Sequence, residues 1–162
     1  MSKRVRLSLI LIVFSLLLAG LWYALRPAAT APVTPQQGYT KALNQARNGQ
    51  PGAARVLYQQ LARSDLAPER RAALYAQLHN YPSPQALKLA SADLHSDEAQ
   101  VRHAAIDAVI GLVPESQRSV LLGPLLEDED QAIRFHAARG LLGLPVDELG
   151  LYFAHLDKVV NA

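Results

Sequence analysis

The 162-residue sequence contains no cysteine, and this absence excludes several kinds of chemistry. Disulfide bonds, thiolate metal sites, a cysteine nucleophile, covalent haem attachment and an N-terminal lipidated cysteine all require a thiol. The sequence also lacks any His-Glu pair, and hence the H-E-x-x-H zinc motif, and it lacks the G-x-S-x-G nucleophile motif. We therefore expect no catalytic, cofactor-binding or metal-binding residues, and predict that the chain is not an enzyme.

The charge of the chain gives little support for nucleic-acid binding. Sixteen basic and 14 acidic residues give a net charge of +2, but Lys3, Arg4, Arg6 and Arg26 flank a single apolar run. The rest of the chain holds 12 basic and 14 acidic residues, which makes it slightly acidic. Because nucleic-acid-binding domains normally carry a basic surface, we expect no nucleic-acid partner.

A long apolar run near the N-terminus predicts a transmembrane helix. Residues 7–25 contain only Ser8, Ser15 and Gly20 outside the apolar set. A helix of that length spans about 28 Å, close to the ~30 Å hydrocarbon core of a bilayer. The three cations that precede the run favour a cytoplasmic N-terminus. Residues 1–26 are thus predicted to be a cytoplasmic tail and a membrane anchor that contacts lipid through residues 7–25.

A cleaved signal peptide is the alternative interpretation of this run. Signal peptides normally have a shorter apolar region of ~7–15 residues. The best small-x-small cleavage site, residues 29–31, is followed by Pro32. An uncleaved anchor is therefore favoured, with cleavage left open. Residues 27–36 are predicted to be a proline-rich, extended linker, because proline removes backbone donors and fixes φ.

The remainder of the chain, residues 37–162, predicts an all-α domain. Apolar residues recur at helical spacing in blocks that Gly, Pro or Asp separate, and no stretch shows the sustained alternation of a strand. The predicted helices cover residues 37–48, 51–64, 68–79, 83–94, 98–111, 115–126, 130–143 and 147–160. The Gly123-Pro124 pair is expected to kink the sixth of these helices.

These helical blocks repeat with a spacing of 32 residues. We expect the repeated alanine to allow close helix packing, the acid to lie in a turn as a helix cap, and the arginine to begin the second helix of each hairpin. The acidic run 127–130 is interpreted in the same way, as a cap for the next helix, because a calcium loop would need a glycine turn. The matching positions are Leu57, Leu89 and Leu121; Asp65, Asp97 and Glu129; Arg70, Arg102 and Arg134; Ala73, Ala105 and Ala137.

Two segments, HSDEAQVRHAAIDAVIGL (95–112) and EDEDQAIRFHAARGLLGL (127–144), resemble the turn and second helix of HEAT repeats. The resemblance implies an α-solenoid of helical hairpins. Residues 39–61 are similar to one tetratricopeptide (TPR) hairpin. The order of motifs also resembles the HEAT/TPR region of multihaem cytochrome-c-like proteins, whose haem-binding cysteines are absent here. The resemblance further implies acid–arginine pairs along the stack, carried here onto Asp65/Arg70, Asp97/Arg102 and Glu129/Arg134.

One solvent-facing row of the second helices predicts a partner-binding groove. A helical wheel at 100° per residue turns this row away from the predicted core. Its residue types include those enriched in interface hot spots. The predicted groove residues are Arg71, Tyr75, His103, Asp107, Phe135 and Arg139.

The last predicted helix, 147–160, is apolar on most of its circumference, which favours burial. Two interpretations stay open: it packs across the preceding hairpin with some residues exposed, or it offers Tyr152 and Phe153 to another chain or another copy. The five histidines are expected to be surface or hydrogen-bonded residues. His103 and His136 are 33 residues apart, so their directions should differ by about 100°.

Together these features favour a single-pass protein of a bacterial inner membrane with a periplasmic repeat domain. We predict a non-catalytic protein–protein interaction scaffold or assembly adaptor, with protein partners in the membrane or the periplasm. A homo-oligomer formed through the C-terminal helix is also considered. The alternative function is an accessory docking subunit of a membrane redox or envelope enzyme complex.

Overall fold

The computed structural model describes residues 3–26 and 34–162, and every regular element within them is a helix. This confirms the predicted all-α fold for the described residues. The chain divides into two compact units, Met1–Thr34 and Pro35–Ala162. The predicted linker 27–36 lies largely outside the described residues. Its last two residues, Pro35 and Gln36, begin a helix instead, because proline suits the first turn, where its missing N–H is not needed.

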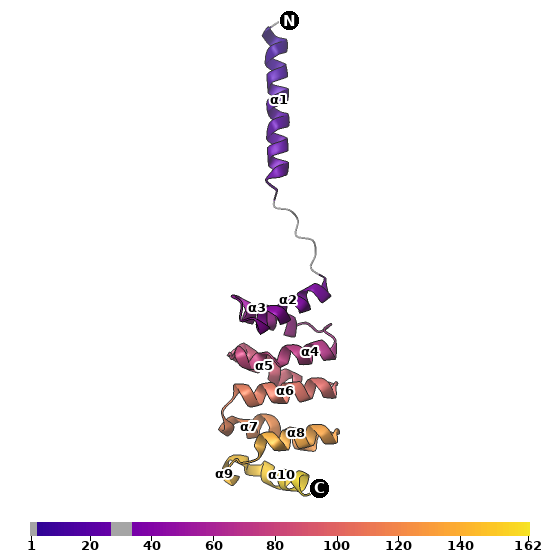
Figure 1. Ribbon diagram of the computed structural model, residues 1–162, viewed down its shortest axis with the longest axis vertical. Helices are drawn as coiled ribbons and strands as arrows, with labels where there is room; N and C mark the ends of the chain where they lie inside the picture. Colours follow the sequence, from indigo (N-terminus) through magenta and orange to yellow (C-terminus); the bar gives the residue numbers. More distant parts are fainter. Residues whose placement is uncertain (1–2, 27–33) are drawn as a thin grey trace. The chain divides into compact units, whose positions relative to one another are not determined.

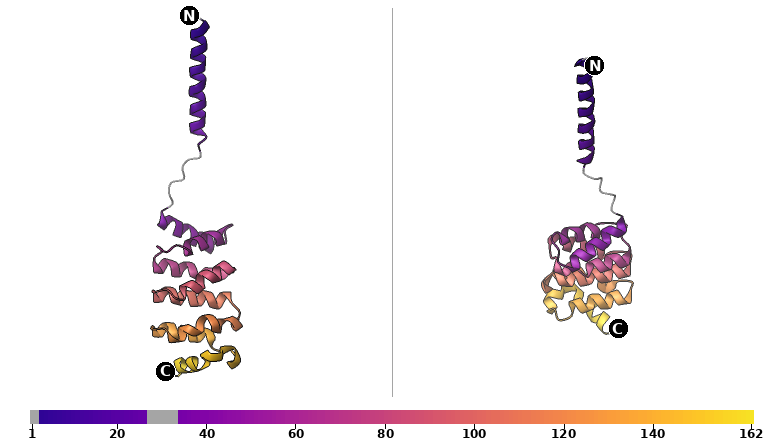
Figure 2. Two further views of the ribbon diagram at one scale, coloured as in Figure 1. Left: turned by 180° about the vertical axis from the view of Figure 1, so that it is seen from behind. Right: turned by 45° about the horizontal axis from the view of Figure 1, so that its top comes forward.

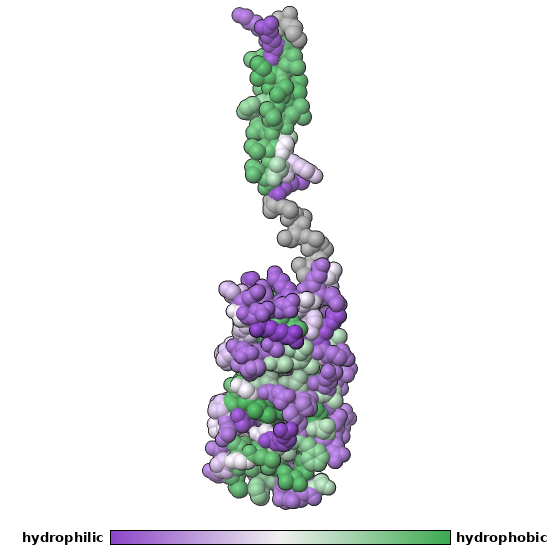
Figure 3. All heavy atoms as spheres, in the orientation of Figure 1, coloured by the Kyte–Doolittle hydropathy of each residue, from purple (hydrophilic) through white to green (hydrophobic). Residues whose placement is uncertain are grey.

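The first unit contains a single apolar helix, α1 (Lys3–Ala24), none of whose residues is buried. Apolar side chains cover the middle of its visible face, and hydrophilic residues lie at both ends (Figure 3). The hydroxyls of Ser8 and Ser15 donate to the backbone carbonyls of Arg4 and Ile12, so neither leaves an unsatisfied polar group. By length and composition α1 is able to cross a membrane once, a criterion that a signal sequence also meets.

The second unit consists of short helices joined by tight turns. Its elements are α2 (Pro35–Arg47), α3 (Ala53–Leu61), α4 (Pro68–Tyr75), η1 (Leu78–Asn80), α5 (Pro84–Asp93), α6 (Ala99–Leu112), α7 (Glu115–Leu122), η2 (Gly123–Glu127), α8 (Gln131–Leu141), α9 (Val146–Leu149), η3 (Gly150–Tyr152) and α10 (Phe153–Val160). All eight predicted helical blocks are present. Three of them are divided, because α4, α7 and α9 each end early and continue as a 3₁₀ turn.

These helices stack in two rows along the domain (Figures 1 and 2). One row contains α2, α4, α6, α8 and α10, in which each helix packs on the next. In the other row, α3 contacts α5 and α7 contacts α9. Elements that follow one another in the sequence, such as α5 and α6 or η2 and α8, pack across the rows. Successive segments of the chain therefore form successive layers.

Alanine and leucine fill the space between the layers. The repeated residues Ala105 and Ala137 have no exposed surface, as expected for positions where helices approach closely. The predicted cap within the acidic run is also confirmed, whereas the repeated acids Asp65 and Asp97 do not cap α4 and α6. Asp130, within the acidic run, caps α8 by accepting a hydrogen bond from the Ala132 N–H. Large leucine and isoleucine side chains complete the core, among them Leu57, Leu61, Leu74, Leu94, Ile106, Leu122, Ile133 and Leu141.

Candidate functional site

Arginine–aspartate pairs connect successive layers of the helical domain. Arg102, in the first turn of α6, has Nε 3.0 Å from Oδ2 of Asp128 and donates from Nη2 to Oδ1 over 3.0 Å. Each of these side chains is only 8% exposed. One layer earlier, Arg71 of α4 pairs with Asp93 of α5 over 2.8 Å. Both arginines also donate to backbone carbonyls of the turn that precedes their own helix. Each arginine thus ties its turn to the following layer.

The pairs implied by the HEAT resemblance are wrong in their acidic partner. Asp65 pairs with Arg63 on the surface, and Arg70 donates to Gln36 instead. The Glu129 carboxylate is 88% exposed and lies 3.9 Å from Arg102. Carboxylates at these turn positions point into solvent. In the two observed pairs, the carboxylate that binds the arginine comes from the following layer: Asp93 ends α5, and Asp128 directly follows η2.

In the remaining predicted pairs, the arginine binds the backbone of the turn and not its carboxylate. Arg102 forms no ion pair with the carboxylate of Asp97. It donates a hydrogen bond to the backbone carbonyl of Asp97 over 3.2 Å. Arg134 likewise donates to the carbonyls of Asp128 and Glu129. These bonds hold the turn closed while leaving the guanidinium free to reach an acid elsewhere.

Two predicted groove residues lie inside the domain and not on an exposed groove. Tyr75 is 2% exposed, and its hydroxyl lies 2.6 Å from Oδ2 of Asp93. Burial, reinforced by this hydrogen bond, raises the pKa of the Tyr75 phenol well above its usual range. Arg71 is held against the same carboxylate. The prediction that Arg71 and Tyr75 face solvent is therefore wrong, because Tyr75 is buried, Arg71 is mostly buried, and both contact the partly buried Asp93 between α4 and α5.

At the C-terminal end of the domain, Arg134 occupies the place in α8 that Arg102 occupies in α6, one repeat earlier. It makes the same two carbonyl hydrogen bonds to the preceding turn. Among the described residues, however, no ion pair connects Arg134 to a carboxylate. A hollow of about 360 Å³ opens here instead, lined by Arg134, Phe135, His155, Lys158 and Val159 together with neighbouring residues.

Exposed apolar side chains surround this end of the domain. Within the described part of the helical domain, every large apolar side chain that is exposed lies at residue 120 or later. Figure 3 shows apolar surface over these last layers. The positions are Val120, Phe135, Leu142, Val146, Leu151, Phe153 and Val160. By contrast, Leu149, Leu156 and Val159 are buried, so the last block both packs on the preceding layer and leaves a face uncovered.

The break in the last predicted helix sets the positions of Tyr152 and Phe153. Gly150 has φ +54°, a left-handed conformation that glycine adopts without strain, and the chain turns there between α9 and α10. Tyr152 then lies half-buried against Gly123, where a Cβ atom would lie 2.4 Å from the Tyr152 ring. Phe153 is 45% exposed. Of the two, only Phe153 is exposed enough to contact a partner.

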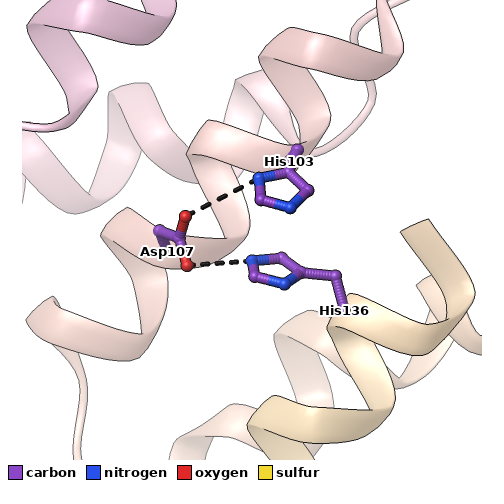
Figure 4. A group of neighbouring side chains, drawn as sticks. All are labelled: His103, Asp107 and His136. Atoms are coloured by element: carbon purple, nitrogen blue, oxygen red, sulfur yellow. Dashed lines mark hydrogen bonds and ion pairs between the residues drawn. The ribbon is translucent and has the colours of Figure 1, made fainter. Parts of the chain in front are cut away.

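A second group of polar residues lies between α6 and α8 (Figure 4). The rings of His103 and His136 stack with centroids 3.7 Å apart and planes 14° apart. Asp107 lies beside both, 2.8 Å from Nε2 of His136 and 3.7 Å from Nδ1 of His103. Burial lowers the pKa of His136, although the Asp107 carboxylate acts in the opposite direction.

The expectation that His103 and His136 point apart did not allow for the geometry of stacked helices. Two side chains on neighbouring parallel helices meet only if they point toward each other. Side chains that point in the same direction on both helices would not meet. An offset of one residue from the repeat turns His136 back toward α6. An Asp four residues after His103, on the same face of α6, was the available signal for this cluster.

The cluster borders a second hollow, of about 430 Å³, whose wall includes His103, Asp107 and Asp130. Small side chains of α4 and α6, Ala72, Ala76 and Ala104, form much of the rest. His103 and Asp107 thus line this hollow, whereas Phe135 lines the other. The structure divides the predicted groove into two separate sites.

Comparison with protein-family models, with curated proteins and with solved structures found no match to this chain. The likeness to HEAT and TPR repeats stays a prediction from the sequence. The function must be inferred from the surfaces described above.

Proposed function

We propose that this chain is a membrane-anchored, non-catalytic interaction scaffold or assembly adaptor. Residues 7–25 would hold it in a bacterial inner membrane with a cytoplasmic N-terminus, and the helical domain would lie in the periplasm. The stacked helices are proposed to be an α-solenoid with TPR- and HEAT-like hairpins. In such arrays each hairpin buries its apolar surface only against its neighbours, so an uncovered apolar end is suited to receive a partner.

The observation that carries this proposal is the concentration of exposed apolar side chains at the C-terminal end of the domain. Soluble monomers rarely leave a contiguous apolar surface uncovered, and such patches mark interaction sites. Phe135 and Arg134 lie together at the hollow there. Aromatic and arginine side chains are enriched among residues that contribute most to binding.

The arginine pairs inside the domain indicate the chemistry of the partner. Arg71 and Arg102 each bind a carboxylate from the next layer. Arg134 repeats the position of Arg102 without such a carboxylate among the described residues. We propose that a partner protein supplies a helical segment whose acidic side chain binds Arg134. Apolar residues of that segment would pack on Phe135 and the exposed side chains of α10.

Site-specific photocrosslinking in membranes tests this proposal. A benzophenone amino acid is placed at Val160, near the hollow, and in a matched control at Gln59, an exposed position on α3. We expect one dominant protein adduct from position 160 and none from position 59. Arg134→Glu should abolish that adduct, because it places a negative charge opposite the acid of the partner.

Equal adducts from positions 59 and 160, or an adduct that Arg134→Glu leaves unchanged, would overturn the proposal. The mass of the adduct separates the kinds of partner. Twice the mass of the chain indicates a second copy at this end in place of a different protein. A haem- or quinone-containing enzyme as the crosslinked partner would support the alternative function, an accessory docking subunit.

A further inference from the structure

The cluster of His103, Asp107 and His136 has the donor atoms of a transition-metal site. It offers two imidazole nitrogens and one carboxylate oxygen, all within 4.8 Å of one another. Imidazole and carboxylate together suit Zn²⁺, whereas Ca²⁺ and Mg²⁺ prefer oxygen donors alone. Three protein ligands of this kind and an open fourth position are typical of tetrahedral zinc sites that also bind water.

The distances within the cluster are close to those that a tetrahedral ion requires. Metal–ligand bonds of about 2.0–2.1 Å place neighbouring ligand atoms about 3.3 Å apart. Asp107 has one oxygen 2.8 Å from Nε2 of His136 and the other 3.7 Å from Nδ1 of His103. These values lie on either side of the required separation, and the stacked rings must rotate apart so that both nitrogen lone pairs point at one ion. Figure 4 shows the ring nitrogens of both histidines directed toward Asp107.

Two helices hold the three ligands in place. His103 and Asp107 are four residues apart on α6, which puts them on one face of that helix. His136 comes from α8 in the next layer, and its side chain is only 12% exposed.

We propose that His103, Asp107 and His136 bind a single Zn²⁺ ion that links α6 to α8. The fourth ligand would be a water molecule in the hollow that borders His103 and Asp107, where alanine side chains leave room for it. This proposal replaces the sequence-based expectation that the chain has no metal site. It is independent of the proposed docking of a partner at Arg134.

Cobalt and zinc titrations of the full chain test the site. The protein is purified in detergent without a histidine tag, stripped with chelator, and titrated with Co²⁺. We expect one equivalent of Co²⁺ to give the intense visible absorption of tetrahedral coordination, and one equivalent of Zn²⁺ to remove it. Zn²⁺ at a hundredfold excess over its dissociation constant should also raise Tm by on the order of 5–10 °C, because it binds only the folded state.

Variants of the three ligands and a matched control complete the test. His103→Ala, His136→Ala and Asp107→Asn should each weaken Co²⁺ binding by at least the roughly 10–100-fold that loss of an outer-sphere partner causes. His95→Ala, at an exposed histidine on the turn before α6, should bind like the original chain. Circular dichroism of the metal-free variants checks that they remain folded, and His136→Gln gives a second variant if His136→Ala does not.

The proposal is overturned if the folded chain shows no saturable absorption at one equivalent. It is equally overturned if folded His136→Ala or His136→Gln binds as tightly as the original chain, or if only His95→Ala loses binding.

Discussion

Among single residues, Arg102 and Asp128 form the most deeply buried ion pair of the described chain. Removing two charges from water is expensive, and hydrogen bonds from Arg102 to Asp128 and to the carbonyls of Ser96 and Asp97 offset that cost. Asp128 also accepts from the backbone N–H of Asp130 at the start of α8. One carboxylate therefore joins two layers and helps to begin a helix.

We predict that Asp128→Ala lowers the free energy of unfolding by about 3–5 kcal/mol, because it leaves the buried Arg102 charge without its partner. The matched control is Glu129→Ala, the neighbouring acid that the HEAT resemblance assigns to the stack. Its carboxylate is exposed, so the change should stay within about 0.5 kcal/mol. Urea unfolding of the full chain in detergent measures both. Equal losses for the two variants would contradict this account of the pair.

The buried phenol of Tyr75 predicts a dependence of stability on alkaline pH. Its pKa is raised in the folded state, and the charged groups that face it are Arg71 of α4 and Asp93 of α5. In the unfolded chain Tyr75 ionises near pH 10, while in the folded chain it stays protonated. Its contribution to stability is thus complete below pH 10 and is lost as the pH rises above that value.

Comparison with Tyr75→Phe isolates this contribution. Above pH 10 the stability difference between the original chain and Tyr75→Phe should shrink by up to about 1.4 kcal/mol per pH unit. Unfolding curves at pH 9, 10 and 11 provide the measurement. Other ionising groups affect both proteins alike. A difference that stays constant over this range would show that the folded phenol ionises normally.

The sequence predicted well that the helices exist and in what order they occur, but it predicted less well where each helix ends. Apolar residues at helical spacing, separated by Gly and Pro, located every block, because burial of one face determines where a helix must form. The predicted kink at Gly123-Pro124 is where α7 ends, but the pattern did not show where α4 and α9 would end. The ends depend on tertiary contacts that lie outside the local sequence, such as that of Gly123 with Tyr152.

Gly123 provides a test of how the last layer is attached. A Cβ at this position would lie 2.4–2.6 Å from atoms of the Tyr152 ring, which cannot move without leaving its place on η2. We predict that Gly123→Ala costs about 1–3 kcal/mol of unfolding free energy. In a Tyr152→Ala background the same change should cost little, because the clashing ring is gone.

Thermal unfolding of the two single variants and the double variant gives this coupling. A suitable control is Gly140→Ala, whose Cβ would meet only the ends of Ile110 and Leu122, at 2.8 Å. Those side-chain ends can rotate away, so the loss should be smaller than for Gly123→Ala. If Gly123→Ala costs the same with and without Tyr152, the ring does not fix the last layer.

For the whole chain, the sequence supported the class of fold but not the location of its sites. The spacing of apolar residues predicts which residues turn inward. It misplaced Tyr75, because a tyrosine can also be buried when its hydroxyl forms a hydrogen bond to an acid such as Asp93. It also missed the meeting of His103 with His136, since that contact depends on how two layers face each other. The geometry of a site depends on how neighbouring layers pack, and the sequence of a single helix does not determine that packing.

The absence of cysteine makes the proposed membrane topology directly measurable. Single cysteines are introduced by Ser2→Cys, before α1, and by Ser116→Cys, at an exposed position on α7. If residues 7–25 anchor the chain with a cytoplasmic N-terminus, a membrane-impermeant maleimide should label Ser116→Cys and not Ser2→Cys in bacterial cells with a permeabilised outer membrane. After lysis both variants should react.

The intact mass of the protein distinguishes an uncleaved anchor from a cleaved signal sequence, because cleavage removes residue 2 altogether. Labelling of Ser2→Cys but not Ser116→Cys in unlysed cells would place the helical domain in the cytoplasm and contradict the proposed topology.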